Sequence, residues 1–190
     1  MQKLNQVSSI LSGYTFRDSL DYMEDGPIHV IQPKNLKLIS DAPCIDLFQN
    51  YEKYLLSDGD ILITIKGSAN TVTQLTLPDK TKYVCSAAFA VIRPSGLKTC
   101  STFLSWYLQC ETAQETLRAM QKGTTVQNLS LKDLQNLPIP SLPLHIQQTI
   151  GELANLEQQR ISILQDLASK RKTLLDHELM KLVKAGGQNE

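Results

Sequence analysis

The 190-residue chain carries no net charge at pH 7, and 42% of its residues are hydrophobic. A neutral chain is not held to nucleic acid by bulk charge alone, although a neutral total still allows a locally basic face. This length allows one compact domain with a sizeable core and one additional extended element. No stretch approaches 18 consecutive apolar residues, and Met1 to Gln6 lack the apolar run of a signal peptide. We therefore expect a cytoplasmic protein without a membrane partner.

The four cysteines do not have the spacing of a metal or redox site. They are Cys44, Cys85, Cys100 and Cys110, with no Cys-x-x-Cys pair and no histidine at ligand spacing. We expect them to be reduced and mostly buried, as in an intracellular protein. The sequence also lacks a Gly-rich loop for S-adenosylmethionine and a Walker-type phosphate loop. We therefore expect no metal, no cofactor and no catalytic residue in this chain.

Short apolar runs separated by turn signals predict β-strands in the first hundred residues. The turn signal at residues 55–60 runs into segment 61–65, which is apolar at almost every position. Such a strand is expected to be buried on both faces. We expect segments 72–77 and 83–85 to continue from it as an antiparallel meander. Further strands are predicted at 28–32 and 87–94.

The apolar period becomes helical after residue 100. Ser101 or Thr102 is expected to cap a helix that contains residues 103–108, and residues 114–120 continue or restart it. Gly123 is predicted to stop this helix. Ser130 precedes Asp133 by three residues, which is the spacing of a capping box around a short helical turn. The predicted domain is therefore α+β, with a mixed or antiparallel sheet.

The stretch from Ile146 to Lys184 is predicted to form one helix, because it contains no proline and, after Gly151, no glycine. Its length is about 39 residues, or roughly 58 Å, whereas an average globular helix has about 11 to 12 residues. We expect a helix of this length to act as a spacer.

Apolar residues recur on this helix at steps of three and four, with an interruption around Gln159 and Arg160. The opposite face is polar and charged, which suits solvent. A narrow apolar seam needs a partner helix, and the sequence contains only one such segment. The helix either packs back across its own domain or, as we favour, pairs with a helix of another chain. The residues expected at that dimer interface are Ile146, Ile150, Leu153, Leu156, Leu164, Leu167 and Leu174.

Three segments, in this order, resemble the motifs of one protein family. They are Gly59-Asp60-Ile61-Leu62-Ile63-Thr64-Ile65-Lys66-Gly67-Ser68, Gly123-Thr124-Thr125-Val126-Gln127-Asn128-Leu129-Ser130, and Leu134-Gln135-Asn136-Leu137-Pro138-Ile139-Pro140 with the helix start that follows. Over about residues 13–182 the chain is similar to the DNA-specificity (S) subunits of Type I restriction and modification systems. The family's Pro-Pro-Leu and acidic-Gln step appears here as Leu142-Pro143-Leu144-His145-Ile146-Gln147-Gln148, without the acids.

The resemblance implies a target recognition domain at residues 1–140, a long coiled-coil spacer and dimerisation helix at 141–184, and a flexible tail at 185–190. Subunits of that family read a bipartite target in double-stranded DNA and guide separate methyltransferase and restriction subunits, without catalysis of their own. A typical S subunit carries two recognition domains and two such helices, whereas this sequence has one of each. We therefore expect a half-subunit that forms an antiparallel homodimer and reads a palindromic split target.

Polar and basic residues near the ends of the predicted strands are the candidates for DNA contact. The expected set is Gln32, Lys34, Lys66, Ser68, Asn70, Thr124, Thr125 and Gln127, with Arg17 and Lys98 as phosphate contacts. Two other classes stay open, a DNA-binding regulatory or antirestriction module of the same fold and a coiled-coil scaffold whose globular part binds protein. Co-purification with a methylase would separate the first from an S subunit, and DNA binding without salt dependence would indicate the second.

Overall fold

The computed structural model describes residues 1–16, 21–36, 38–67, 69–78, 80–121 and 127–186. Contacts divide the chain into two units, Met1–Gly151 and Glu152–Glu190. The first unit contains sheets and short helices, and the second contains most of one long helix, so the predicted α+β class is confirmed. Some predicted features fall outside the described residues, namely Arg17, Ser68, Gly123, Thr124, Thr125 and the end of the tail.

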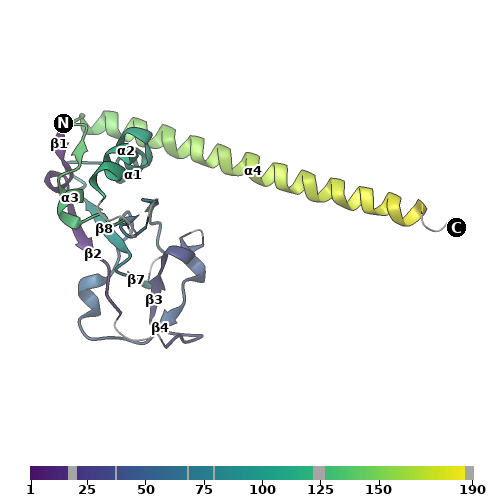
Figure 1. Cartoon of the computed structure of the whole chain (residues 1–190), viewed down its shortest axis with the longest axis horizontal. Coiled ribbons are helices and arrows are strands. Elements are labelled where there is room, and N and C mark those ends of the chain that lie inside the picture. The colour runs from purple at the N-terminus through teal and green to yellow at the C-terminus, as the bar shows by residue number, and fades with distance from the viewer. Residues whose placement is uncertain (17–20, 37, 68, 79, 122–126, 187–190) are drawn as a thin grey trace. The chain divides into compact units, whose positions relative to one another are not determined.

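A four-stranded antiparallel sheet forms the centre of the first unit (Figure 1). Its strands lie in the order β2 (Ser8–Ser12), β8 (Phe89–Pro94), β5 (Ile61–Thr64) and β6 (Val72–Gln74). All four residues of β5 are buried, as predicted for this strand. Ile61 pairs with Ile92 of β8 on one side and with Gln74 of β6 on the other. β5 therefore lies inside the sheet and not at its edge.

The two faces of β5 belong to different hydrophobic cores. Ile61 and Ile63 pack in one core with Phe103 of helix α1 (Ser101–Gln109). Leu62, between them in sequence, packs in a second core with Phe89. Because successive strand residues point to opposite faces, a strand between two cores must be apolar at every position.

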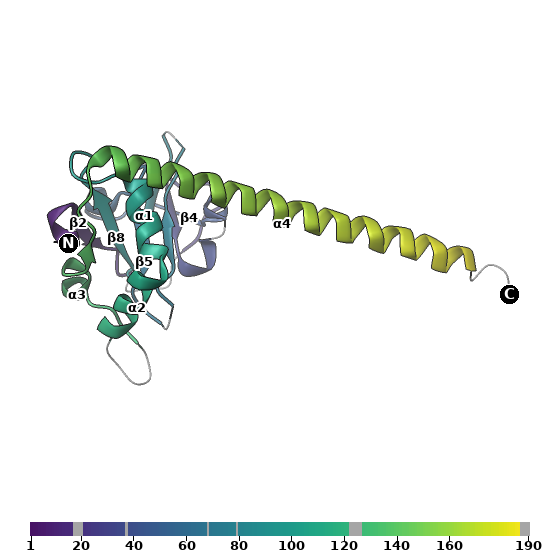
Figure 2. The same ribbon diagram turned by 90° about the horizontal axis from the view of Figure 1, so that it is seen from above.

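Short helices and a small sheet complete the first core. α1 and α2 (Glu111–Met120) lie close to the main sheet in Figure 2, and α3 (Leu131–Gln135) follows them in the chain. β1 (Gln2–Lys3) pairs antiparallel with β9 (Pro138–Ile139), so the two ends of the globular sequence meet. Short 3₁₀ helices occupy Leu4–Gln6, Pro33–Asn35, Ile39–Asp41 and Tyr51–Tyr54.

A second sheet contains β4 (Cys44–Ile45), β3 (Ile28–Ile31) and β7 (Lys82–Cys85), with β3 in the middle. β7 runs parallel to β3, and Val84 pairs with Val30. The prediction that segment 83–85 continues the antiparallel meander of β5 and β6 is therefore wrong. The apolar residues of β7 required burial, but burial alone does not specify which strand is the neighbour.

The predicted caps had different outcomes. The side chain of Ser130 accepts the backbone N–H of Asp133 at 3.0 Å, so the cap of α3 is confirmed. Neither predicted residue caps α1, whose N-cap residue is Cys100. The N–H of Cys100 donates to Oε1 of Gln147 at 3.1 Å. This acceptor comes from a distant part of the chain, where a local sequence pattern cannot reveal it.

The long helix α4 (Leu144–Gly186) confirms the predicted uninterrupted helix. Its 43 residues correspond to about 65 Å at 1.5 Å per residue. Its first turns, up to Gly151, belong to the first unit, and residues 155–184 have exposed side chains. Among the described residues, no helix combines the length and hydropathy needed to cross a membrane.

Candidate nucleic-acid interface

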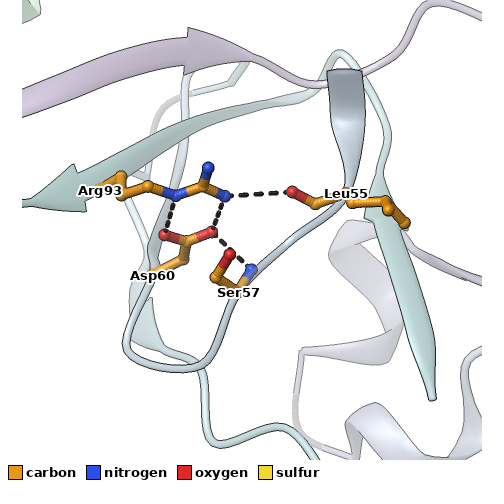
Figure 3. A network of polar contacts seen from close by, with 4 residues as sticks. All are labelled: Leu55, Ser57, Asp60 and Arg93. Carbon is orange, nitrogen blue, oxygen red and sulfur yellow. Dashed lines mark hydrogen bonds and ion pairs between the residues drawn. The ribbon is translucent and has the colours of Figure 1, made fainter. Parts of the chain in front are cut away.

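The acidic residue of the first motif supports the fold and does not face a ligand. Asp60 is 1% exposed and receives two hydrogen bonds from Arg93, from Nε to Oδ1 (2.8 Å) and from Nη2 to Oδ2 (2.7 Å). The N–H of Ser57 also donates to Oδ2, and Arg93 Nη2 reaches the carbonyl of Leu55 (Figure 3). These hydrogen bonds to Asp60 raise the pKa of Arg93 above its ordinary value. The network ties the loop before β5 to strand β8.

The loop that follows β5 is held by helix α2. Asn70 is 5% exposed, and its Nδ2 donates to the carbonyl of Thr64 while its Oδ1 accepts a bond from Gln121. The side chain of Gln114 donates to the carbonyl of Asn70 (3.1 Å). The prediction that Asn70 contacts DNA therefore loses support, because both ends of its amide are engaged within the protein. Its position keeps the loop in place.

Two segments distant in sequence meet at this loop. The N–H of Gly67 donates to the carbonyl of Gln127, and the N–H of Leu129 donates to the carbonyl of Ile65, each at 2.9 Å. Gly67 has a φ of +100°, a conformation that suits glycine. Lys66 and Gln127 both have exposed side chains. The structure therefore brings these two predicted DNA contacts close together.

Gln32 and Lys66 line one open groove of about 430 Å³, although they follow strands of different sheets. We call it the Gln32 groove. Tyr22 is 48% exposed and also lines it, and its hydroxyl accepts a bond from Gln32 Nε2 at 2.9 Å. Lys66 is the one charged residue among the described residues that line the groove. The others are Tyr14, Thr15, Phe16, Ser86, Ala87 and Ala88.

An aromatic cluster supports one side of this groove. The ring of Tyr14 lies 4.7 Å from that of Phe16 and 4.3 Å from that of Phe48, measured between centroids. Tyr54 packs edge-on against Tyr14 at 5.0 Å. Such contacts between rings fix the positions of Tyr14 and Phe16 more firmly than solvent-exposed loops usually allow. Tyr14 and Tyr22 were not predicted from the sequence as DNA contacts, although an aromatic residue within a polar loop is a usable signal.

Lys34 and Lys98 do not themselves line the groove. The ammonium of Lys34 lies 5.9 Å from the centre of the Tyr22 ring, within reach of a cation–π contact. Lys98 follows β8, and its Nζ donates to the carbonyl of Gln6. Ala88 in the groove precedes β8, and a six-residue strand spans about 20 Å. Lys98 therefore belongs to a different part of the surface.

The cysteines are free, and Cys44 and Cys85 are buried. Burial is the main cause that raises the pKa of the Cys85 thiol, to about 12, so this thiol stays protonated at neutral pH. Within the described ranges, no three His, Cys, Asp or Glu side chains are grouped so that they could hold a metal ion. The chemistry offered by the Gln32 groove is hydrogen bonding, one positive charge and aromatic surface.

The sequence of this chain matches the model of one protein family. The model of the Type I restriction modification DNA specificity domain matches residues 1–170. The chain belongs to this family. The specificity-domain match includes the Gln32 groove, the β5 loop and the beginning of α4. The suspected resemblance to S subunits is thereby confirmed.

Solved structures share the fold of this specificity-domain protein. The S subunit of a Type I restriction-modification system from M. genitalium is 18% identical, with a TM-score of 0.60 over 87% of this chain and 40% of that one. The HsdS subunit from Thermoanaerobacter tengcongensis is 21% identical, with a TM-score of 0.63 over 86% and 38%. A chain from a study of assembly and conformational transition of the type I R-M system is 22% identical, with a TM-score of 0.68 over 92% and 42%.

At these identities the similarity establishes the fold only. The chain spans about two fifths of the length of each of these three solved chains. A search of curated proteins found no match.

Proposed function

We propose that this specificity-domain protein reads a DNA sequence and directs a separate Type I modification methyltransferase, and its restriction partner, to that sequence. One observation carries the proposal: Gln32 and Lys66, from two different sheets, meet with Tyr22 in one open groove. Family membership supports the same role. The protein contributes recognition, and methyl transfer and cleavage belong to the partner subunits.

The groove suits the edges of bases better than a phosphate alone. A side-chain amide both donates and accepts hydrogen bonds, which is how Asn and Gln read bases. Lys66 adds a cation that can contact a guanine edge or a neighbouring phosphate. Gln127 lies on the segment paired with the Lys66 loop, so it extends the polar surface beside the groove. Tyr22 and Tyr14 supply rigid contact area with few rotatable bonds.

We further propose that α4 pairs antiparallel with a second copy of this chain. The exposed fractions of Leu153, Leu156, Leu164, Leu167 and Leu174 lie between 53% and 62%. Full burial of an exposed leucine is worth about 1.5–3 kcal/mol, and these side chains are about half exposed, so each contributes a part of that and a seam of them favours association. Ile146 is 39% exposed, and Ile150 packs partly against the core of its own chain, at the base of this seam. A two-fold pair would present two identical readers to a palindromic split target.

In this proposal, residues 1–140 form the DNA-reading domain, residues 141–184 the spacer and dimerisation helix, and residues 185–190 a tail. The protein works in the cytoplasm together with the genome and the methyltransferase. Similarity to solved structures of Type I S subunits supports this arrangement through the shared fold.

Selection of duplexes from a randomised library by the full chain tests the function. We expect enrichment of a two-part palindrome and an affinity for the selected duplex that falls as salt rises. Enrichment of no sequence, together with an affinity that salt does not change, would contradict the proposal and favour a protein-binding scaffold. Co-purification of a methyltransferase with the tagged protein tests the proposed partner.

A further inference from the structure

We infer that Gln32, held in place by Tyr22, reads an adenine in the DNA target. This inference rests on the proposed function and names the chemistry of its central site. It also assigns a role to Tyr22, which is not among the DNA contacts predicted from the sequence. Gln32 retains hydrogen-bonding capacity after its bond to Tyr22 is made.

The amide of Gln32 has two N–H donors on Nε2 and an acceptor on Oε1. One N–H donates to the hydroxyl of Tyr22 at 2.9 Å. Oε1 accepts no hydrogen bond from any residue that the structure describes. One N–H donor and the Oε1 acceptor of the same planar amide therefore stay free at the groove.

Adenine is the base that satisfies both free groups at once. In the major groove it presents the N7 acceptor beside the N6 amino donor, and Gln pairs with these two atoms. Guanine presents two acceptors, which would leave Oε1 without a donor. Thymine presents one acceptor and a methyl group, and cytosine presents one donor, so each leaves one end of the amide unpaired. An unpaired amide end at a closed interface lowers affinity for these bases.

Tyr22 is a positioning residue in this arrangement. Its bond to Nε2 restricts rotation of the amide, whose terminal torsion is otherwise broad. The ammonium of Lys34 near the face of Tyr22 restricts the phenol in turn. Gln32 is thereby oriented before DNA arrives, and less conformational freedom is lost on binding. Removal of the Tyr22 hydroxyl should therefore weaken base discrimination although the Gln32 amide is still present.

The experiment repeats the library selection with Gln32→Ala and Tyr22→Phe and then measures affinity for duplexes changed at one base pair. Tyr51→Phe is the control, because Tyr51 also has a hydroxyl that accepts a hydrogen bond and a lysine ammonium near its ring, and it is not among the described residues that line the groove. Its hydroxyl accepts a bond from Lys82, whose ammonium lies 5.0 Å from the ring centre. Thermal unfolding of every variant separates loss of reading from loss of fold.

We expect the wild type and Tyr51→Phe to require adenine at one position of the half-site. Gln32→Ala should lose roughly 5- to 150-fold of the discrimination at that position only. Tyr22→Phe should lose roughly 2- to 10-fold at the same position. Unchanged preference in Gln32→Ala, or loss of preference at a position occupied by another base, overturns the inference while sequence-specific binding still stands. If the wild type selects no sequence, the proposed function itself fails, which is a distinct result.

Discussion

Gly151 of α4 passes so close to Thr102 of α1 that a β-carbon at position 151 would lie 2.2 Å from Thr102 Oγ1 and 2.9 Å from the backbone nitrogen of Phe103. The long helix therefore begins in tight contact with the globular unit, and only glycine fits at the crossing. Gly151→Ala should lower the free energy of unfolding by about 1–3 kcal/mol, the usual cost of overpacking. Urea unfolding measures this. Gly96→Ala is the control, because a β-carbon there meets nothing within 4 Å and should leave stability almost unchanged.

Gln147 links the first turn of α4 to the loop before α1. Its Oε1 accepts bonds from Thr99 Oγ1 (2.8 Å) and Cys100 N (3.1 Å), and its Nε2 donates to the carbonyl of Leu142 (2.9 Å). The side chain is 1% exposed, so Gln147→Ala leaves buried polar groups without partners. We expect a loss of roughly 2–4 kcal/mol in the free energy of unfolding. The exposed neighbour Gln148, changed to Ala, should cost far less in the same measurement, and equal losses would contradict this role.

Asp60 and Arg93 form the ion pair that joins the β5 turn to β8. Asp60→Asn removes the charge from a buried site and leaves a guanidinium with a weaker acceptor. Removal of one partner of a fully buried pair costs about 3–5 kcal/mol, and the side chain of Arg93 is 37% exposed, so we expect about 2 kcal/mol. Calorimetry at neutral pH measures the change. Glu52→Gln, which neutralises an exposed carboxylate, is the reference variant. An equal loss of unfolding free energy in both variants would show that the Asp60–Arg93 pair contributes no more than an exposed charge.

Lys66 should account for part of the salt dependence of DNA binding. If it contacts a phosphate, Lys66→Ala weakens all sequences alike and reduces the slope of log affinity against log salt by roughly one. If it contacts a guanine, the loss falls on one base-pair position. Fluorescence anisotropy over a salt series distinguishes the two. Lys132→Ala, in α3 and outside the Gln32 groove, provides the matched change of charge, and an equal effect of both variants would argue against the groove.

The exposed leucines of α4 should determine the mass of the protein in solution. Leu164→Asp combined with Leu167→Asp places charges in the proposed seam, where association would have to bury them. Light scattering should give a dimer for the wild type and a monomer for the double variant. Gln165→Asp adds the same side chain beside the seam and should leave the dimer intact. A wild type that is already monomeric at micromolar concentration, with and without DNA, would refute the pairing.

Sequence patterns predicted a structural feature correctly where the interacting residues are close together in the chain. The cap of α3 was predictable because Ser130 and Asp133 are three residues apart and bond to each other. The surroundings of the α1 N-terminus were not, because the acceptor for the Cys100 N–H comes from Gln147, 47 residues away, and no side chain that the structure describes caps this helix. Strand β7 was recognisable as a buried strand, whereas its parallel partner β3 depends on the packing of two sheets.

In the candidate site, too, only the structure showed which of the residues selected from the sequence come together. Gln32 and Lys66 were selected from the sequence as polar residues after strands, but their common groove and the bond from Gln32 to Tyr22 appear only in the structure. Asn70 had the same polar character in the sequence and proved to be buried, with its amide engaged. Residue type alone cannot distinguish an amide that faces a ligand from one that holds a loop.

The sequence by itself determined the α+β class, the buried strand β5, the uninterrupted helix α4 and the resemblance to the specificity family. These features depend on periodicity, on breakers and on motifs that are contiguous in the chain. The tertiary structure alone decided the parallel pairing of β3 with β7, the hydrogen bond from the Cys100 N–H to Gln147 and the meeting of Gln32, Tyr22 and Lys66 in one groove. Each of these depends on residues brought together from separate segments, because their contacts form only when the sheets and helices pack.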